Sequence, residues 1–322
     1  MFDQRAIQNQ KDGGANKDEP EVTISVVIPS YNPGKEIHAC LASLWQQKVA
    51  IGYEVIVVDS SEQEQTEQWQ KAYPGLRVIH LEKRTYPGAA RNIGARAARG
   101  SIVTFTDTDC RTDPRWLEKI WEAHQKGYDV VGGSVVNGTP GNYIGTAEYL
   151  LEFNEMNPWM KPREVSALPS CNLSIRRSVF SVCGYLEDAE KGSDTLFCSK
   201  VIAHGLKIFF TPAAKVFHVN RCRLKKYLRN QKALGRGACG IRLKARRHGA
   251  FLIKYPVLIS LIPLMRAVAI SRRLLHSRWR LFGEFLWHFP LILVGLVAYT
   301  AGFIAGYLVA HRNGMLPRAP HA

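Results

Sequence analysis

The sequence predicts an α/β fold with a mostly parallel, doubly wound sheet, followed by C-terminal helices that associate with a membrane. Short runs rich in Val and Ile alternate with helix-like segments through the first half of the chain, an order typical of a parallel sheet flanked by helices. Positive charge is concentrated in the last third, where residues 221–322 carry 19 Lys and Arg against Glu284 alone. The same region contains an uncharged run, residues 289–310, that is long enough to cross a bilayer as a helix.

Each predicted element has a local signal. Pro29 ends the first strand, Gly100 follows the Ala- and Arg-rich helix, and Pro114 opens the helix after the fourth strand. The expected strands are 24–28, 54–58, 76–81, 102–106 and 129–133, with a later strand at 206–210. The expected helices are 36–47, 62–72, 88–99, 114–126 and 196–203.

The chain is expected to have three parts. Residues 1–20 are polar and contain no apolar core, which predicts a disordered lead rather than a signal peptide. Residues 21–240 form the predicted catalytic domain, which we expect on the cytoplasmic side of the cytoplasmic membrane. Residues 241–322 form a basic interfacial region with one transmembrane helix at 289–310.

The basic C-terminal third indicates a polyanionic partner, either nucleic acid or an anionic membrane. The apolar stretches at 251–275 and 289–310 favour the membrane, so we expect no nucleic acid partner. Gly302 and Gly306 have the GxxxG spacing that allows close helix packing, which predicts a homodimer. The seven scattered cysteines contain no Cys-x-x-Cys pair, so neither disulfide nor zinc chemistry is expected.

Asp107 and Asp109 directly follow the apolar run 101–105. In an extended segment, side chains two residues apart point the same way, so the two carboxylates can face one site. Such a pair suits Mg²⁺ or Mn²⁺ bound together with the phosphates of a substrate. The alternative is an Asp-rich turn that merely ends a strand.

Two further polar segments support the metal interpretation. Residues 30–32 follow the first strand and Asp59 follows the second, just as Asp107 and Asp109 follow the fourth. Ligands of open α/β sheets bind at the carboxyl ends of the strands, near the point where the strand order reverses. The three segments together predict a site for a nucleoside diphosphate.

Taken in order, six segments of the sequence resemble family 2 glycosyltransferases of the GT-A fold, of the membrane-associated and non-processive type. They are residues 26–32, 57–60, 88–94, 106–110, 172–177 and 192–195. The resemblance covers about residues 22–240 and implies that the catalytic domain has the GT-A fold. It also implies transfer of a sugar from a nucleotide sugar with inversion at the anomeric carbon.

The resemblance assigns roles to individual residues. Asp59 would contact the base or ribose, Tyr31 would pack near the base, and Arg91 would lie close to the diphosphate. Asp107 and Asp109 would hold the divalent ion, and His218 would be a third ligand or a structural histidine. The full set implied for the nucleotide sugar is Pro29, Tyr31, Asn32, Asp59, Arg91, Asn92 and Asp107, and Asn172, Gln231 and Arg236 would lie on the acceptor or diphosphate side.

Asp194 falls where the family carries its general base. A carboxylate there can take the proton of an acceptor hydroxyl as its oxygen attacks the sugar. From the residues alone, Asp194 also fits a helix N-cap, a position that Asp favours.

Two departures from the family pattern refine this prediction. A single acid, Asp59, stands where relatives commonly have two, so the donor can be a UDP- or a GDP-sugar. The region around Gln231 and Arg236 lacks the Gln-x-x-Arg-Trp of processive synthases. The predicted acceptor is a hydroxyl or phosphate of a lipid-linked molecule in glycolipid, cell-envelope or exopolysaccharide synthesis.

Two rival functions are weaker. A nucleotidyltransferase usually has a Gly-rich basic loop after its first strand, whereas residues 29–35 contain only Lys35 as a basic residue. A catalytically dead membrane scaffold would have lost its acids, whereas Asp59, Asp107, Asp109 and Asp194 are all present.

Overall fold

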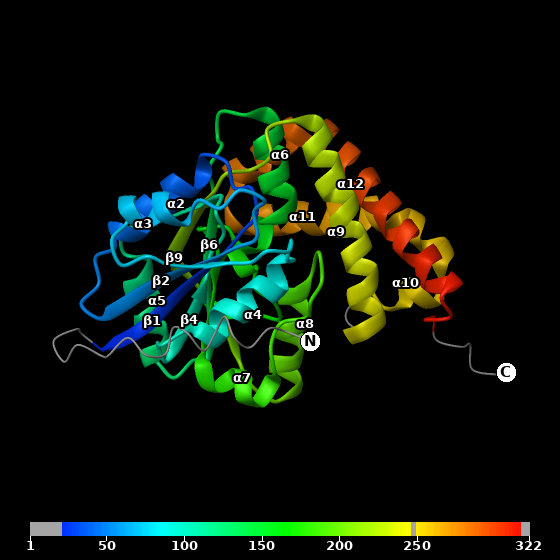
Figure 1. The fold of residues 1–322 in the computed structure, drawn as a ribbon. Helices are drawn as coiled ribbons and strands as arrows, with labels where there is room; N and C mark the ends of the chain where they lie inside the picture. The colour runs from blue at the N-terminus through cyan, green and yellow to red at the C-terminus, as the bar shows by residue number, and fades with distance from the viewer. Residues whose placement is uncertain (1–20, 246–248, 317–322) are drawn as a thin grey trace.

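The computed structural model describes residues 21–245 and 249–316 (Figure 1). The predicted disordered lead, residues 1–20, lies outside the described residues. A nine-stranded mixed sheet has the order β3-β2-β1-β4-β8-β6-β9-β5, with β7 paired to β9. The strands are β1 (Val22–Ser30), β2 (Gly52–Asp59), β3 (Arg77–His80), β4 (Ile102–Phe105), β5 (Cys110–Thr112), β6 (Val130–Asn137), β7 (Arg163–Glu164), β8 (Leu173–Arg176) and β9 (Ile208–His218).

The strand order reverses at β1. The chain first builds outward from β1 through β2 to β3, and β4 then returns to pair with β1 in parallel on its other side. The carboxyl ends of β1, β2 and β4 therefore meet at one edge, as the sequence predicts. That edge is the topological switch point at which open α/β sheets bind ligands.

Strand β8 is an antiparallel element that the sequence pattern does not predict. It lies between β4 and β6 and is antiparallel to both. Because β8 runs the opposite way, the residues that precede it, the 3-10 turn Ser170–Asn172, lie at the same edge as the carboxyl end of β4. The sheet is thus mostly parallel in its first half and mixed in its second.

Alternate residues of β1 point to opposite faces of the sheet. Ile24, Val26 and Ile28 join one buried cluster, with apolar residues of α2, α3 and α5, whereas Val27 joins a second cluster with α4, α7 and α8. The sheet is therefore covered on both faces, which confirms the doubly wound prediction. These helices are α2 (Glu36–Trp45), α3 (Thr66–Ala72), α4 (Pro87–Ala97), α5 (Trp116–Gln125), α7 (Arg177–Cys183) and α8 (Ser193–Ala203).

Several predicted boundaries differ from the structure. Strand β6 continues to Asn137 instead of ending at Gly133, because after a register shift its last residues pair with the end of β9. The predicted strand at 206–210 begins at Ile208 and continues to His218. Pro212 is one of the residues 212–214 that the register shift leaves without a partner on β6, a position where a strand tolerates proline. The predicted helix at 62–72 begins only at Thr66.

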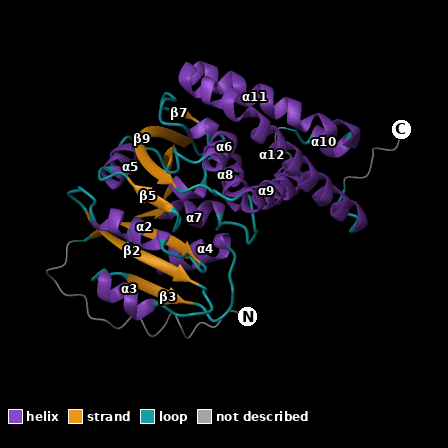
Figure 2. Ribbon diagram, turned by 90° about the horizontal axis from the view of Figure 1, so that it is seen from above, coloured by secondary structure: helices purple, strands orange, loops and turns teal. Residues whose placement is uncertain are grey.

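The C-terminal helices form a separate layer beside the sheet, as Figure 2 shows for α9, α10, α11 and α12. Helix α9 (Leu224–Ala245) continues past residue 240, the predicted end of the catalytic domain. Helix α6 (Tyr143–Glu152) packs against both α9 and α12. The remaining elements are α6 (Tyr143–Glu152), η1 (Asn154–Met156), η2 (Ser170–Asn172), α9 (Leu224–Ala245), α10 (Phe251–Lys254), η3 (Pro256–Leu261), α11 (Ile262–Ser277) and α12 (Trp279–Arg312).

Helix α12 contains the predicted span at 289–310 but begins ten residues earlier, at Trp279. Among the described residues it is the one helix long and apolar enough to cross a bilayer, judged by length and composition. Its glycines face α9 of the same chain: a Cβ on Gly302 would lie 1.9 Å from the carbonyl oxygen of Lys232. The GxxxG spacing therefore serves packing within the chain, which removes the basis for the predicted homodimer.

Candidate active site

The nucleotide corner predicted from the sequence lies where β1 and β2 end. The carboxylate of Asp59 is buried and accepts a 2.7 Å hydrogen bond from the hydroxyl of Ser61, and the ring of His80 lies 3.3 Å away. The backbone N–H of Asn32, which has a φ of 45°, donates to the same Ser61 hydroxyl. These bonds join the ends of β1 and β2 around the Asp59 carboxylate.

Tyr31 presents an aromatic ring beside this corner. The guanidinium of Arg84 lies 4.6 Å from the centre of the ring, so the ring forms part of a cationic surface. Pro29 lies within β1, where it is paired with Val58, and therefore helps to set the position of the loop that carries Tyr31.

Arg91 and Asp107 form an ion pair at the switch point. Arg91 is 4% exposed although its side chain is charged, and one of its terminal nitrogens donates to Asp107. Its Nε has no hydrogen-bond partner among the described residues. A buried guanidinium with an unused donor beside a strand-end carboxylate is suited to bind an anionic ligand.

Asp109 and His218 come together across the β5–β9 ladder. Cys110 is the register partner of His218, so the preceding residue, Asp109, reaches the end of β9. The Nε2 atom of His218 lies 3.7 Å from a carboxylate oxygen of Asp109, and its Nδ1 atom lies 3.0 Å from the side-chain oxygen of Asn220. A bond from that Nδ1–H would leave Nε2 free to bind a metal ion.

The chemistry of these groups fits a small divalent ion. Asp109, Cys110 and His218 place potential ligand atoms within 4.8 Å of one another. A hydrogen bond with the thiol of Cys171 and burial both raise the pKa of the Cys110 thiol well above its usual range, and Mg²⁺ and Mn²⁺ prefer oxygen ligands to sulfur. Asp109 and His218, with the nearby Asp107 carboxylate, therefore remain as oxygen and nitrogen ligands of the kind that Mn²⁺ or Mg²⁺ accepts.

Asp194 lies in the first turn of α8, on the other side of the site. One carboxylate oxygen accepts from the backbone N–H of Ser170 at 3.0 Å, and the other accepts from the N–H of Thr195 at 2.7 Å. Gly192, not Asp194, occupies the N-cap position. The two hydrogen bonds from backbone N–H groups hold the carboxylate in place.

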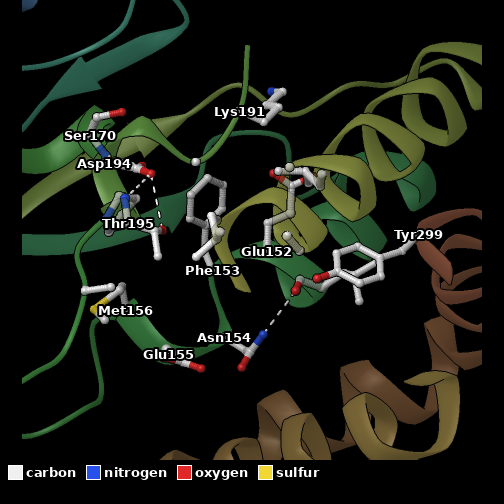
Figure 3. Close-up of a pocket in the computed structure, with 18 of the residues that line it drawn as sticks. Glu152, Phe153, Asn154, Glu155, Met156, Ser170, Lys191, Asp194, Thr195 and Tyr299 are labelled. Atoms are coloured by element: carbon white, nitrogen blue, oxygen red, sulfur yellow. Dashed lines mark hydrogen bonds between the residues drawn. The ribbon is translucent and has the colours of Figure 1, made fainter. Parts of the chain in front are cut away.

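A cleft of about 820 Å³ contains both groups of acids. Asp107, Asp109 and His218 line one part of it, and Asp194 lines another. Figure 3 shows Asp194 with Ser170 and Thr195 on one side and Tyr299 on the opposite side. The volume is in the range of ligand pockets in proteins.

Several predicted site residues lie outside this cleft. The amide of Asn172 is fully buried and donates to the carbonyl oxygens of Ser134 and Ala214, and Asn92 exchanges hydrogen bonds with the backbone of Leu186. Both N–H groups of the Asn172 amide are therefore used within the protein, and the Asn92 amide is held by the backbone of Leu186.

The two predicted residues of α9 are also absent from the lining of the cleft. Gln231 is buried and donates to Glu152 at 2.7 Å, whereas Arg236 is exposed. The fold therefore gives Gln231 a positioning role behind the cleft wall, and α9 contributes other residues to the wall itself.

Glu152 is a cleft residue that the sequence analysis missed. It ends α6 and accepts hydrogen bonds from the amides of Asn230 and Gln231 on α9. Burial, together with the neighbouring carboxylate of Glu148, raises the pKa of Glu152 to about 7. No local motif marks this residue, because its surroundings are created by the packing of α6 against α9.

Known proteins share this architecture. Residues 25–184 match the sequence model described as glycosyl transferase family 2. The chain belongs to this family. Asp107 and Asp109 of this family 2 glycosyltransferase lie inside the matched range, whereas Asp194 and His218 lie beyond it.

The sequence is also similar to that of the glycosyltransferase AglE of Haloferax volcanii. The two are 28% identical over 251 residues, which cover 74% of this chain and 81% of the relative.

Solved structures show that the glycosyltransferase has the GT-A fold. Residues 1–349 of S. aureus TarS, in complex with UDP-GlcNAc, match with a TM-score of 0.50 and 19% identity over 91% of this chain and 92% of that one. GalNAc-T7 with UDP, GalNAc and Mn²⁺ matches with a TM-score of 0.51 and 20% identity over 66% of this chain. The match spans about half of the GalNAc-T7 chain, 48%.

Proposed function

We propose that this glycosyltransferase is a metal-dependent, inverting enzyme at the cytoplasmic face of the cytoplasmic membrane. It would transfer a sugar from a UDP- or GDP-sugar to a hydroxyl or phosphate of a lipid-linked acceptor in glycolipid, cell-envelope or exopolysaccharide synthesis. The observation that carries this proposal is the presence of Asp107, Asp109, His218 and Asp194 in one cleft at the switch point of the sheet.

The donor would bind along the strand ends. Asp59 and Tyr31 would hold the nucleoside, and the buried Arg91 would contact the diphosphate with its unused Nε–H. Asp107, Asp109 and His218 would hold Mg²⁺ or Mn²⁺. When bound, such an ion neutralises negative charge on the leaving diphosphate.

Asp194 would act on the acceptor. Its carboxylate takes the proton of an acceptor hydroxyl while that oxygen attacks the anomeric carbon, and the bond from this carbon to the diphosphate oxygen breaks on the opposite side. The proton ends on Asp194, the electron pair ends on the diphosphate, and the sugar is inverted. The hydrogen bonds from Ser170 and Thr195 position the carboxylate for this step.

The membrane part of the proposal is supported by the surface of the C-terminal helices. Large apolar side chains are exposed there, among them Trp279 at 71%, Trp287 at 72% and Val257 at 83%. Exposed apolar surface next to an excess of Lys and Arg is typical of proteins that bind anionic membranes. A GT-A site next to such a surface favours an acceptor that is itself in the membrane.

A panel of nucleotide sugars tests the proposal. Detergent-solubilised protein would be incubated with each sugar donor, with and without chelator, in the presence of a lipid extract or of soluble sugars as acceptor. We expect release of one nucleoside diphosphate that depends on metal and on the lipid extract. Release of pyrophosphate from a nucleoside triphosphate, or transfer to soluble acceptors alone, would contradict it.

A further inference from the structure

One end of the cleft is positively charged and lies apart from the carboxylates of Asp107, Asp109 and Asp194. Beyond Glu152 it is lined by Arg242 of α9 and Arg266 of α11, next to Tyr299 of α12. These residues lie in the C-terminal layer, outside the strand-end residues assigned to the donor.

The two arginines converge on one face of α12. The guanidinium of Arg266 lies 4.0 Å from the centre of the Tyr299 ring, and that of Arg242 lies 5.4 Å from the centre of the Phe303 ring. Tyr299 and Phe303 are four residues apart in one helix, so they are neighbours one turn apart on the same face. The two cations therefore lie over successive turns of α12 although they come from different helices.

Neither arginine is neutralised by an acid among the described residues. Arg242 donates to the carbonyl oxygen of Ala238 at 2.9 Å, and its buried Nε has no hydrogen-bond partner within residues 21–245 and 249–316. Arg266 donates to the carbonyl oxygen of Leu151 at 3.4 Å. A third arginine of the cleft, Arg273, differs because Glu155 pairs with it at 2.6 Å. Two guanidiniums without an acidic partner in one wall are suited to bind a phosphate group.

The same end of the cleft is apolar beside the arginines. Phe251 and Met265 line it and are 42% and 43% exposed. An anion-binding pair next to exposed apolar side chains is suited to a molecule with a phosphate head and a hydrocarbon tail.

We propose that Arg242 and Arg266 bind the phosphate of the lipid-linked acceptor and thereby place its reactive hydroxyl near Asp194. The inference rests on the proposed function, since it assigns the chemistry of the acceptor for the same cleft. The position of Arg242 fits this role: Ile241 beside it packs against Gly192, two residues before Asp194.

Binding of farnesyl phosphate to the full-length protein in detergent tests this subsite. Each variant, Arg242→Gln and Arg266→Gln, should weaken binding roughly tenfold, and the double variant should weaken it further. Binding of farnesol, which has the tail without the phosphate, should be weaker in the wild type and little changed by the substitutions. Arg229→Gln and Arg272→Gln remove exposed charges from the same two helices and should leave farnesyl phosphate binding unchanged.

Two controls separate the outcomes. Binding of UDP or GDP with Mn²⁺ should be the same in the double variant and the wild type, which shows that the donor end is folded. If the donor end is intact and the double variant binds farnesyl phosphate as well as the wild type does, the subsite is excluded. If the wild type itself binds no nucleotide and turns over no nucleotide sugar, the proposed function fails instead.

The phosphate could also belong to bulk lipid, and vesicles distinguish this source. We expect the double variant to bind phosphatidylglycerol vesicles as the wild type does, because the arginines lie inside the cleft. Loss of vesicle binding with unchanged farnesyl phosphate binding would overturn the assignment to the acceptor.

Discussion

The two edges of the sheet both bury charged residues, but they use them differently. At the amino-terminal edge, Glu54 is 5% exposed and is bonded by the hydroxyl of Ser25, the guanidinium of Arg77 and both the backbone and the side chain of Arg99. At the carboxyl-terminal edge, Arg91 is equally buried but keeps an unpaired Nε. The first edge is saturated with hydrogen bonds, whereas the second retains unused hydrogen-bonding capacity.

This difference separates stability from function. A buried polar group that is fully paired holds the fold together, and removing its partner leaves an uncompensated charge. A buried polar group without a partner lowers stability and is suited to a ligand that completes its bonds. The hydroxyls of Ser30 and Thr106, at the ends of β1 and β4, are also buried and find no partner in the part of the chain that the structure describes. The carboxyl-terminal edge is therefore the edge prepared for binding.

The largest expected effect is at the carboxyl-terminal edge. Asp109→Asn should lower kcat/KM by roughly 10³-fold, because it removes a ligand of the divalent ion, and it should not lower the melting temperature. Asp129→Asn, at the opposite edge, is the matched control and should leave activity unchanged. A melting temperature that falls as much as activity does would mean that Asp109 is structural and would break the comparison.

Asp194 and Glu152 are two of the cleft carboxylates that a general base could come from. Asp194→Asn should lower kcat by about 10²-fold with donor binding retained, because proton transfer is lost. Glu152→Gln should lower kcat by less than about tenfold, because its carboxylate is engaged by Asn230 and Gln231. The reverse ranking of the two variants would transfer the role of base to Glu152.

The amino-terminal edge should show the opposite behaviour. Glu54→Ala should lower the free energy of unfolding by about 3 kcal/mol, because it leaves two arginines and a serine without their buried partner. The kcat of the molecules that remain folded should be unchanged. Glu122→Ala removes a surface carboxylate paired with Lys119 and is the control for stability, measured by thermal unfolding. An equal loss of unfolding free energy in both variants would show that the buried Glu54 cluster stabilises the fold no more than a surface ion pair does.

The smallest expected effect concerns pH. In the unfolded chain Glu152 loses its proton near 4.5, and in the folded chain near 7, because of burial and the neighbouring Glu148. Between these two pH values the folded protein keeps a proton on Glu152 that the unfolded chain has released. The contribution of Glu152 to the free energy of unfolding therefore falls as pH rises from about 4.5 to about 7. Glu152→Gln should flatten the dependence of melting temperature on pH in that window. Parallel curves for the two proteins would contradict the raised pKa.

Sequence reasoning was most successful where function follows from local order. The ends of β1, β2 and β4 can be predicted to meet because parallel neighbouring strands end at one edge, and this places Asp59 and Asp107 at the same edge. Asp109 and His218 are 109 residues apart in the chain and meet only through the β5–β9 ladder. Their proximity could be proposed only from the family resemblance.

The rest depends on packing that leaves no local pattern. Antiparallel β8 brings Ser170 to Asp194, and the packing of α9 and α11 on α12 brings Arg242 and Arg266 to one surface. In the sequence these arginines are two among many basic residues, and only the positions of Tyr299 and Phe303 distinguish them. Asn172 shows the opposite error. It belongs to a segment that resembles the family, but its amide is buried and bonds the backbone instead of facing the cleft.

The most direct test of the central claim is donor turnover as a function of added Mn²⁺ in protein stripped of metal by a chelator. We predict that release of nucleoside diphosphate stops in the stripped wild type, returns when Mn²⁺ is added, and does not return in Asp109→Asn. Full turnover by stripped wild-type protein would contradict a divalent ion held by Asp107, Asp109 and His218.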